Sequence, residues 1–221
     1  IYDDYVEYTK KYKKIYGDNT IVFIEIGSFF EIYGVHNEIE SSGANMIEIG
    51  NLLNIQISRK NKSIIENSRE NPLMAGFPNH SLKKFIDSLI KHNYTIILVE
   101  QVTPPPNPKW EVTNIISPST YFDSLQTYDT NNLVVMYFEK IKNWKDDHYS
   151  YAFGITKIDL STSRTSVYET ICDIFTINEE ITRYYLNTYP KEIIVVSKEH
   201  VDIELPDNVY CHNFINRMDE C

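Results

Sequence analysis

The chain has 221 residues, of which 42% are hydrophobic and 24% charged, a balance typical of a globular protein with two ordinary domains. No apolar run approaches the roughly 20 residues of a membrane helix, so we expect no membrane partner. The three cysteines and six histidines are scattered without metal-ligand spacing. This predicts a reducing, intracellular compartment, no disulfide framework and no structural metal.

The net charge of −10 argues against a general nucleic-acid binder, because phosphate binding usually leaves a basic footprint. The acidity is concentrated in residues 129–221, which carry 9 basic and 16 acidic side chains, whereas residues 1–128 carry 12 and 15. A local basic cluster, Arg59, Lys60 and Lys62, lies in the segment SRKNK. Such clusters are more often solvated surface than phosphate sites.

Residues 2–16 are predicted to form an amphipathic helix, because tyrosines recur at spacings of three and four, at Tyr2, Tyr5, Tyr8, Tyr12 and Tyr16. Packing of this stripe on a sheet is favoured over a base-stacking platform. Gly17 is suited to end the helix. The β-branched run TIVFIEI (20–26) predicts a buried strand, and FFEIY (29–33) either continues it or returns after Gly27.

The segment that follows is predicted to be helical over residues 37–54, with a short strand at 55–58 and a long mobile loop at 59–73.

The remainder of this half contains one more helix and two strands. The helix is expected in SLKKFIDSLIKHN, with Ser81 or Asn79 as its cap, and the strands in YTIILVEQV (94–102) and WEVTNII (110–116). Together these elements predict an α/β domain with a mixed sheet.

The polar, unpatterned segment 122–132 is the predicted linker, which divides the chain into domains 1–128 and 129–221. Beyond the linker the pattern predicts three strands, a helix and a strand, at 133–141, 149–160, 164–169, 178–187 and 192–197. A meander followed by a helix and a strand predicts a second α/β domain.

The chain lacks the motifs of the commonest enzymes, with no P-loop, no G-x-S-x-G elbow and no H-E-x-x-H, so we predict no catalytic residue. One alternative rests on Asp159, which ends an apolar strand where ribonuclease-H-like nucleases place their first metal-binding aspartate. A two-metal nuclease site needs several converging carboxylates. The candidates have no defensible spacing; they are Glu169, Asp173, Glu179 and Glu180. A turn cap before Ser161 is the favoured role of Asp159.

Several segments, in order, resemble the motifs of the DNA mismatch-repair family MutS. IVFIEIGSFFEIYG resembles the motif G-D-F-Y-E, and NPLMAGFPNH, with the helix and the EQ strand after it, resembles the M-A-G-x-P-x-H region. WEVTNIISPST is similar to E-V-T-R-V-V-T-P-G-T, and GITKIDLSTSRTSVYE and YPKEIIVVS resemble the connector domain. The resemblance covers most of the chain.

The resemblance implies a mixed-sheet mismatch-recognition domain (MutS domain I) at 1–128 and a ribonuclease-H-like connector domain (MutS domain II), without nuclease activity, at 129–221. The chain would be the N-terminal fragment of a longer protein whose lever, clamp and ATPase domains follow Cys221. That parent would use ATP and Mg²⁺, dimerise and engage downstream repair proteins, whereas the fragment would need no cofactor. Its DNA partner would be a duplex with mispaired or unpaired bases.

By position, Phe29 matches the family's wedge phenylalanine, which enters the minor groove of kinked duplex DNA, and Glu31 matches its paired glutamate. Neighbouring residues of a strand face opposite ways, so Phe29 and Glu31 share one face while Phe30 is expected in the core. The resemblance also assigns DNA-backbone or groove contacts to Arg59, Lys60, Lys62 and Met74.

The chain departs from the family pattern at five positions. Ser28 replaces the family's aspartate and Phe30 its tyrosine. Trp110 and Asn114 stand where the family often has arginine, and Ser119 replaces a glycine. A further alternative is a MutS relative that binds recombination intermediates, although such relatives generally lack the Phe-x-Glu pair found here.

Overall fold

The computed structural model describes residues 1–104, 106–121, 131–142, 149–198, 201, 203–205 and 210–215, the last of these as backbone only. The chain divides into two compact units, Ile1–Ser117 and Pro118–Cys221. This division precedes the predicted linker, 122–132, most of which lies outside the described residues.

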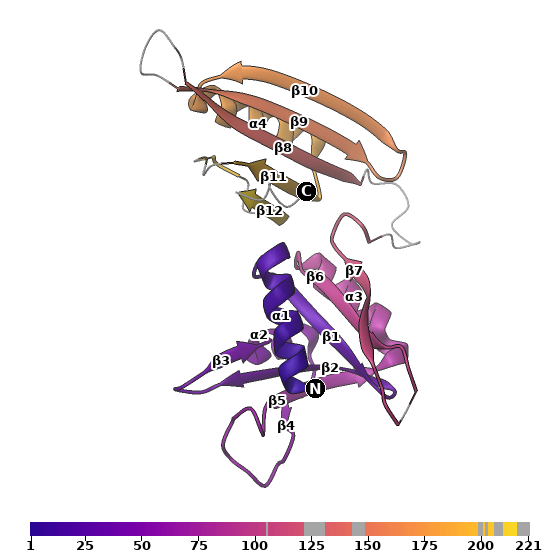
Figure 1. Ribbon diagram of the computed structural model, residues 1–221. Helices are drawn as coiled ribbons and strands as arrows, with labels where there is room; N and C mark the ends of the chain where they lie inside the picture. The colour runs from indigo at the N-terminus through magenta and orange to yellow at the C-terminus, as the bar shows by residue number, and fades with distance from the viewer. Residues whose placement is uncertain are drawn as a thin grey trace. The chain divides into compact units, whose positions relative to one another are not determined.

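The first unit is built on one mixed sheet with the strand order β4-β5-β2-β1-β6-β7, and β3 pairs with β2 (Figure 1). The strands are β1 (Thr20–Ile26), β2 (Phe29–His36), β3 (Ser41–Gly43), β4 (Ser58–Arg59), β5 (Leu73–Pro78), β6 (Thr95–Gln101) and β7 (Trp110–Ile116). β1 and β6 run parallel, and the other pairs are antiparallel. The mixed sheet predicted from the sequence is confirmed, and 29–33 returns after Gly27 as β2.

Helices cover both faces of this sheet. On one face, α1 (Tyr2–Tyr16) packs Tyr5 edge-on against Tyr33, with ring centroids 5.5 Å apart. On the other face lie α2 (Met46–Leu53) and α3 (Leu82–Lys91), and the Phe85 ring of α3 stacks on Phe77 at 4.0 Å. Two tyrosines of the α1 stripe are buried and three are half-buried, which confirms that the stripe packs on the sheet.

The helix predicted over residues 37–54 begins only at Met46. The side chain of Asn37 accepts hydrogen bonds from the backbone N–H groups of Ile39 (2.9 Å) and Glu40 (2.7 Å), and this turn returns the chain into β3 instead of a helix. Ile39, an apolar residue of the segment predicted to be helical, is 95% exposed. Asn45 then caps α2.

Of the two predicted caps of α3, Ser81 occupies the N-cap position, but its side chain makes no capping hydrogen bond. Asn79 lies in a 3₁₀ turn (Asn79–Ser81) before the helix and does not cap it. The Nδ2 group of Asn79 instead donates to the Glu25 carboxylate at 2.8 Å, so this side chain ties the start of α3 to β1.

The second unit contains a sheet with the order β10-β9-β8-β11-β12, in which β8, β9 and β10 are antiparallel and β8, β11 and β12 are parallel. Its elements are β8 (Asn132–Lys142), β9 (Tyr149–Asp159), β10 (Arg164–Cys172), α4 (Ile174–Thr188), β11 (Glu192–Ser197) and β12 (Tyr210–Ile215). α4 packs one apolar face, which includes Ile177 and Ile181, on the sheet.

The predicted α/β character of the second unit is confirmed, with two differences. α4 begins four residues before the predicted helix, because Asp173 caps it by accepting from the Thr176 N–H at 2.9 Å. β12, which pairs parallel with β11, was not predicted, because its sequence YCHNFI lacks a clear apolar pattern. Within the described parts of both units, no helix is long and apolar enough to cross a membrane.

Candidate nucleic-acid interface

The hairpin between β1 and β2 carries Phe29 at its tip. Gly27 and Ser28 form the two-residue turn, and Gly27 has φ +62°, the left-handed region that tight hairpin turns require. Phe29 pairs with Ile26 directly beside the turn, and its side chain is 47% exposed. An aromatic ring of this size at a hairpin tip is accessible to a partner.

Phe30, the next residue, lies on the opposite face and is 2% exposed. Its ring packs 6.1 Å from the ring of Phe77, in the layer between the sheet and α3. The predicted burial of Phe30 is therefore confirmed. With phenylalanine in place of the family's tyrosine, this buried position holds no hydroxyl group.

Glu31 shares the face of Phe29 and is half-buried between Ile24 and Gly76 of the neighbouring strands. A Cβ on Gly76 would lie 3.1 Å from the Glu31 Cγ and 2.9 Å from the Phe30 carbonyl oxygen, so a glycine lets β5 pass beside this side chain. The Glu31 Oε2 accepts a hydrogen bond from the Tyr33 hydroxyl. Within the described part of the chain, Oε1 has no hydrogen-bond partner.

Tyr33 is a partner of Glu31 that sequence reasoning missed. Burial raises the pKa of the Tyr33 phenol, and the adjacent Glu31 carboxylate raises it further, so the phenol stays protonated and donates. The signal was present in the sequence, because residues two apart on a strand share a face. Glu31 is thus held in one orientation beside Phe29.

Met74 joins this face, whereas Arg59 does not. Met74 pairs with Tyr33 and lies two residues along β5 from Gly76, which pairs with Glu31. Because residues two apart on a strand share a face, the Met74 side chain lies on the same face as Glu31. Arg59 pairs with Leu73, on the opposite face, and its buried Nε has no hydrogen-bond partner among the described residues. Leu73, the partner of Arg59, lies five residues, or about 17 Å, along β5 from Pro78, the partner of Phe29.

The two basic residues after Arg59 are both exposed; they are Lys60 and Lys62. They belong to a loop that the structure holds in place with polar contacts. The Asn71 side chain, 2% exposed, accepts from the Asn61 N–H (2.7 Å) and donates to the carbonyls of Ile64 (3.1 Å) and Glu66 (3.0 Å).

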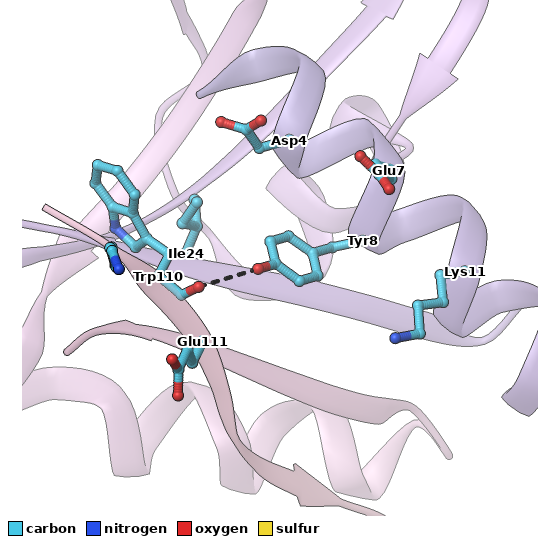
Figure 2. A pocket seen from close by; sticks show the side chains of 8 residues that line it. Asp4, Glu7, Tyr8, Lys11, Ile24, Trp110 and Glu111 are labelled. Atoms are coloured by element: carbon cyan, nitrogen blue, oxygen red, sulfur yellow. Dashed lines mark hydrogen bonds between the residues drawn. The ribbon is translucent and has the colours of Figure 1, made fainter.

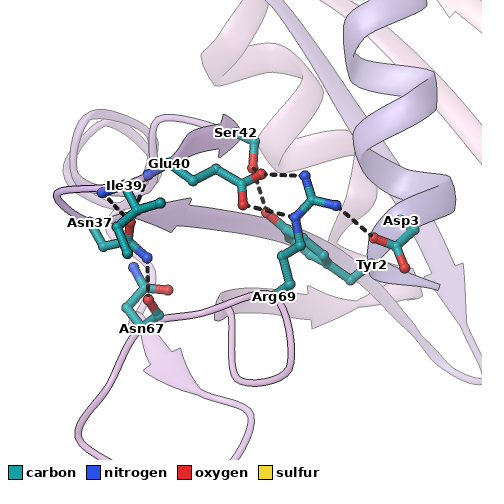
Figure 3. Close-up of polar contacts among 8 residues, drawn as sticks. All are labelled: Tyr2, Asp3, Asn37, Ile39, Glu40, Ser42, Asn67 and Arg69. Atoms are coloured by element: carbon teal, nitrogen blue, oxygen red, sulfur yellow. Dashed lines mark hydrogen bonds and ion pairs between the residues drawn. The ribbon is translucent and has the colours of Figure 1, made fainter.

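A second set of contacts fastens this loop to the β2–β3 hairpin and to α1 (Figure 3). The Arg69 guanidinium binds both oxygens of the Glu40 carboxylate, at 2.8 and 2.9 Å, and lies 3.9 Å from the Asp3 carboxylate. Asn67 donates to the His36 carbonyl at 3.3 Å. The loop that sequence patterning described only as long and mobile therefore has an internal and an external set of hydrogen bonds.

A pocket of about 410 Å³ lies between α1 and β7 (Figure 2). Ile24, which lines it, pairs with Glu31, so the pocket lies on the sheet face that carries Phe29. Trp110 lines it; the indole N–H donates to the Glu25 carbonyl at 2.7 Å, and the Trp110 carbonyl accepts from the Tyr8 hydroxyl at 3.1 Å. Trp110, where the family often has arginine, thus joins β7 to β1 and α1. The pocket's charged lining is mixed, comprising Asp4, Glu7, Lys11, Lys109 and Glu111.

Asp159 of the second unit caps a turn. Its carboxylate accepts from the Thr162 hydroxyl (2.7 Å) and the N–H groups of Ser161 (3.0 Å) and Asn131 (3.3 Å). These hydrogen bonds lower the pKa of Asp159, and the bond from Thr162 has the largest effect. Glu169 pairs with Gly154, five residues and about 17 Å along β9 from Asp159. No cluster of three metal-binding side chains occurs in the described part of either unit.

The glycine-to-serine departure at Ser119 is accommodated by a buried pair. The Ser119 hydroxyl and its backbone N–H (3.1 Å) both donate to the Glu192 carboxylate, and Ser119 and Glu192 are both buried. The Asn131 side chain donates to the Ser119 carbonyl at 2.5 Å. These contacts join the start of the second unit to its own sheet.

Comparison with known proteins decides the family. The family model described as MutS domain I matches residues 5–125. The chain belongs to the MutS family. A relative from Acanthamoeba polyphaga mimivirus, named as a mutS homolog (L359), is 31% identical over 170 residues, which are 76% of this chain and 15% of the relative. The DNA mismatch repair protein MutS of Streptococcus pyogenes serotype M49 is 29% identical over 188 residues, covering 83% of this chain and 19% of that protein.

The chain spans less than a fifth of the length of either MutS relative. The match places the first unit in MutS domain I, a DNA-binding domain and not a catalytic one.

Proposed function

We propose that this chain reads distorted duplex DNA as the N-terminal part of a MutS-type mismatch-repair ATPase, with Phe29 as the wedge and Glu31 as its partner. The second unit would serve as the connector domain, and the whole protein would bind ATP and Mg²⁺, dimerise and engage downstream repair proteins through parts beyond this chain. The observation that carries the proposal is the contrast between Phe29, which is half-exposed at a hairpin tip, and the buried Phe30.

An exposed aromatic wedge can sense mismatches without reading base identity. Insertion of an apolar side chain into the minor groove unstacks a base step at a cost of a few kcal/mol and kinks the duplex. A mispaired or unpaired base has already lost part of its stacking, so the same deformation costs less there. Phe29 would therefore favour deformable sites, which suits a protein that must find many different errors.

The carboxylate of Glu31 would add a penalty for intact DNA. Its negative charge lies on the face that carries Phe29, where phosphates repel it. At a disrupted base pair a carboxylate oxygen can accept a hydrogen bond from an exposed base amino group. Because Tyr33 occupies Oε2, Oε1 is the atom available for that contact.

The test is a competition binding experiment at low salt with this chain. A labelled duplex with a single mismatch is displaced by unlabelled mismatched or matched duplexes, or by a four-way junction, and the ratio of affinities is measured by fluorescence anisotropy. We expect Phe29→Ala to abolish the preference for the mismatch. Stronger binding to the junction than to the mismatch would favour the alternative role in recombination.

Phe175 provides the matched control, because it is 79% exposed on α4 of the second unit. Phe175→Ala removes the same side chain from the surface and should leave the mismatch preference unchanged. Retention of the full preference by Phe29→Ala would refute the wedge.

A further inference from the structure

A second cavity of about 380 Å³ lies at the edge of the first sheet, between α1, the β2–β3 hairpin and the start of α2. Its polar lining includes Lys10, Lys13, His36, Ser41, Ser42 and Asn45, and we name it the lysine pocket. In contrast to the pocket beside Trp110, it has no carboxylate among its described lining residues. In a chain with a net charge of −10, a cavity with two lysines and no carboxylate in its described lining is a candidate anion site.

The two lysines supply the positive charge. Lys10 and Lys13 are three residues apart on α1, so their side chains share one side of the helix. Neither forms an ion pair within the described part of the chain, whereas Arg69 and Arg183 do. Their charges are therefore available to a ligand.

The opposite wall is polar and includes a helix N-terminus. The His36 Nε2–H donates to the Ala44 carbonyl at 2.8 Å, so Nδ1 accepts from the Ser41 hydroxyl at 3.0 Å. Gly43 has φ +84°, and a Cβ there would lie 2.4 Å from the Tyr33 carbonyl oxygen, so a glycine is required for this tight path. Asn45 is the N-cap of α2, and it places the positive end of that helix at the cavity.

Two carboxylates that bond to lining residues, Glu40 and Glu48, already have hydrogen-bond partners. Glu48 accepts from the Asn45 side chain at 2.8 Å and from the Tyr94 hydroxyl at 2.5 Å. Glu40 accepts from the Ser42 hydroxyl at 2.7 Å, and Lys10 also contributes to its electrostatic environment. Arg69, however, binds both Glu40 oxygens from the far side (Figure 3). These hydrogen bonds, with that of Arg69 the largest, hold the pKa of Glu40 at about 2, so its charge is committed to this pair.

We propose that the lysine pocket binds a phosphate group, supplied either by the DNA backbone or by a free phosphate-bearing molecule. Two lysine ammonium groups and a helix N-terminus match the negative charge and the acceptor oxygens of a phosphate. His36 is seven residues along β2 from Phe29, or about 24 Å. A DNA phosphate bound there would lie on the order of seven base pairs from the wedge, and this source of the ligand rests on the proposed function.

The first experiment uses inorganic phosphate as the probe. Amide NMR resonances of the pocket wall, at Ser41 and Gly43, are followed as phosphate replaces chloride at constant ionic strength. We expect saturable shifts in the native chain and none in the double variant Lys10→Ala/Lys13→Ala. The control Lys84→Ala/Lys91→Ala removes the same charge from α3 and should retain the shifts.

The second experiment identifies the source by measuring the salt dependence of duplex affinity for the same variants. If both lysines contact DNA phosphate, the slope of log affinity against log salt falls by about 2 in Lys10→Ala/Lys13→Ala and is unchanged in the control. If Lys10→Ala/Lys13→Ala loses the phosphate-induced shifts but keeps the native salt slope, the ligand is a free phosphate-bearing molecule. No phosphate shifts together with an unchanged slope, or equal effects in the pocket and control variants, would overturn the proposal.

The two proposals fail separately in these measurements. Loss of the lysine pocket should weaken matched and mismatched duplexes by the same factor, so that the mismatch preference is retained. Phe29→Ala should remove that preference and leave the salt slope unchanged, because no charge is altered.

Discussion

The neighbours Phe29 and Phe30 should respond to alanine substitution in opposite ways. Phe30 is 98% buried, and removal of such a ring costs about 3–5 kcal/mol of unfolding free energy, since transfer and cavity effects add. Full burial of a phenylalanine side chain is worth about 1.5–3 kcal/mol, and Phe29 is only about half buried. We therefore expect Phe29→Ala to lower the free energy of unfolding by about 1 kcal/mol or less. The loss in Phe30→Ala should be larger by at least about 2 kcal/mol.

Urea unfolding measured by tryptophan fluorescence can resolve this difference. Trp110 lies in the first unit, and Trp144 falls outside the described residues, so both variants are made in a Trp144→Phe background where Trp110 alone reports. With a slope of about 2 kcal/mol per molar urea, a 2 kcal/mol difference separates the two midpoints by about 1 M.

Binding completes the comparison. Phe29→Ala should keep a near-native midpoint and lose its mismatch preference, whereas Phe30→Ala should lose stability. Equal losses of stability in the two variants would refute the assignment of Phe29 and Phe30 to opposite faces, and with it the physical basis of the wedge.

Three further substitutions test the contacts around these residues. Gly76→Ala would place a Cβ 2.9 Å from the Phe30 carbonyl oxygen, so we expect about 1–3 kcal/mol of destabilisation in urea; a neutral effect would contradict the close approach of β5. Asn71→Ala removes three hydrogen bonds inside residues 60–72, and limited proteolysis should then cut this loop faster than in the native chain, while unchanged cleavage would show that these bonds do not hold it. The pKa of Asp159 is lowered in the folded chain, so its carboxylate stabilises the fold above the ordinary value of 3.8, and this contribution is lost as the pH falls through the lowered pKa. Asp159→Asn should accordingly be less stable than the native chain at neutral pH and equal to it in acid, and a stability difference that persists in acid would refute the charge-based explanation.

Patterns local in sequence were predictable because secondary structure follows short-range periodicity. The tyrosine spacing located α1 and the face that it buries, and strand alternation separated Phe29 from Phe30. The same reasoning failed at residues 37–45, because the Asn37 side chain offers the backbone a turn that competes with the helix.

Contacts between distant residues could not be read from periodicity. The loop after β4 is held by Arg69 and Glu40, 29 residues apart, and the departure at Ser119 is balanced by Glu192, 73 residues away. The identity of each partner depends on which strands become neighbours, and the sequence pattern does not specify this order.

The sequence by itself determined most of the helices and strands, the family resemblance and the alternation that exposes Phe29, because each depends on residues close together in the chain. Only the tertiary structure decided that Arg59 lies on the opposite face from Phe29, that Glu31 is oriented by Tyr33, and that Lys10 and Lys13 face a cavity without carboxylates. These features arise where helices and strands from separate parts of the chain pack together, so burial and electrostatics there are properties of the packed fold.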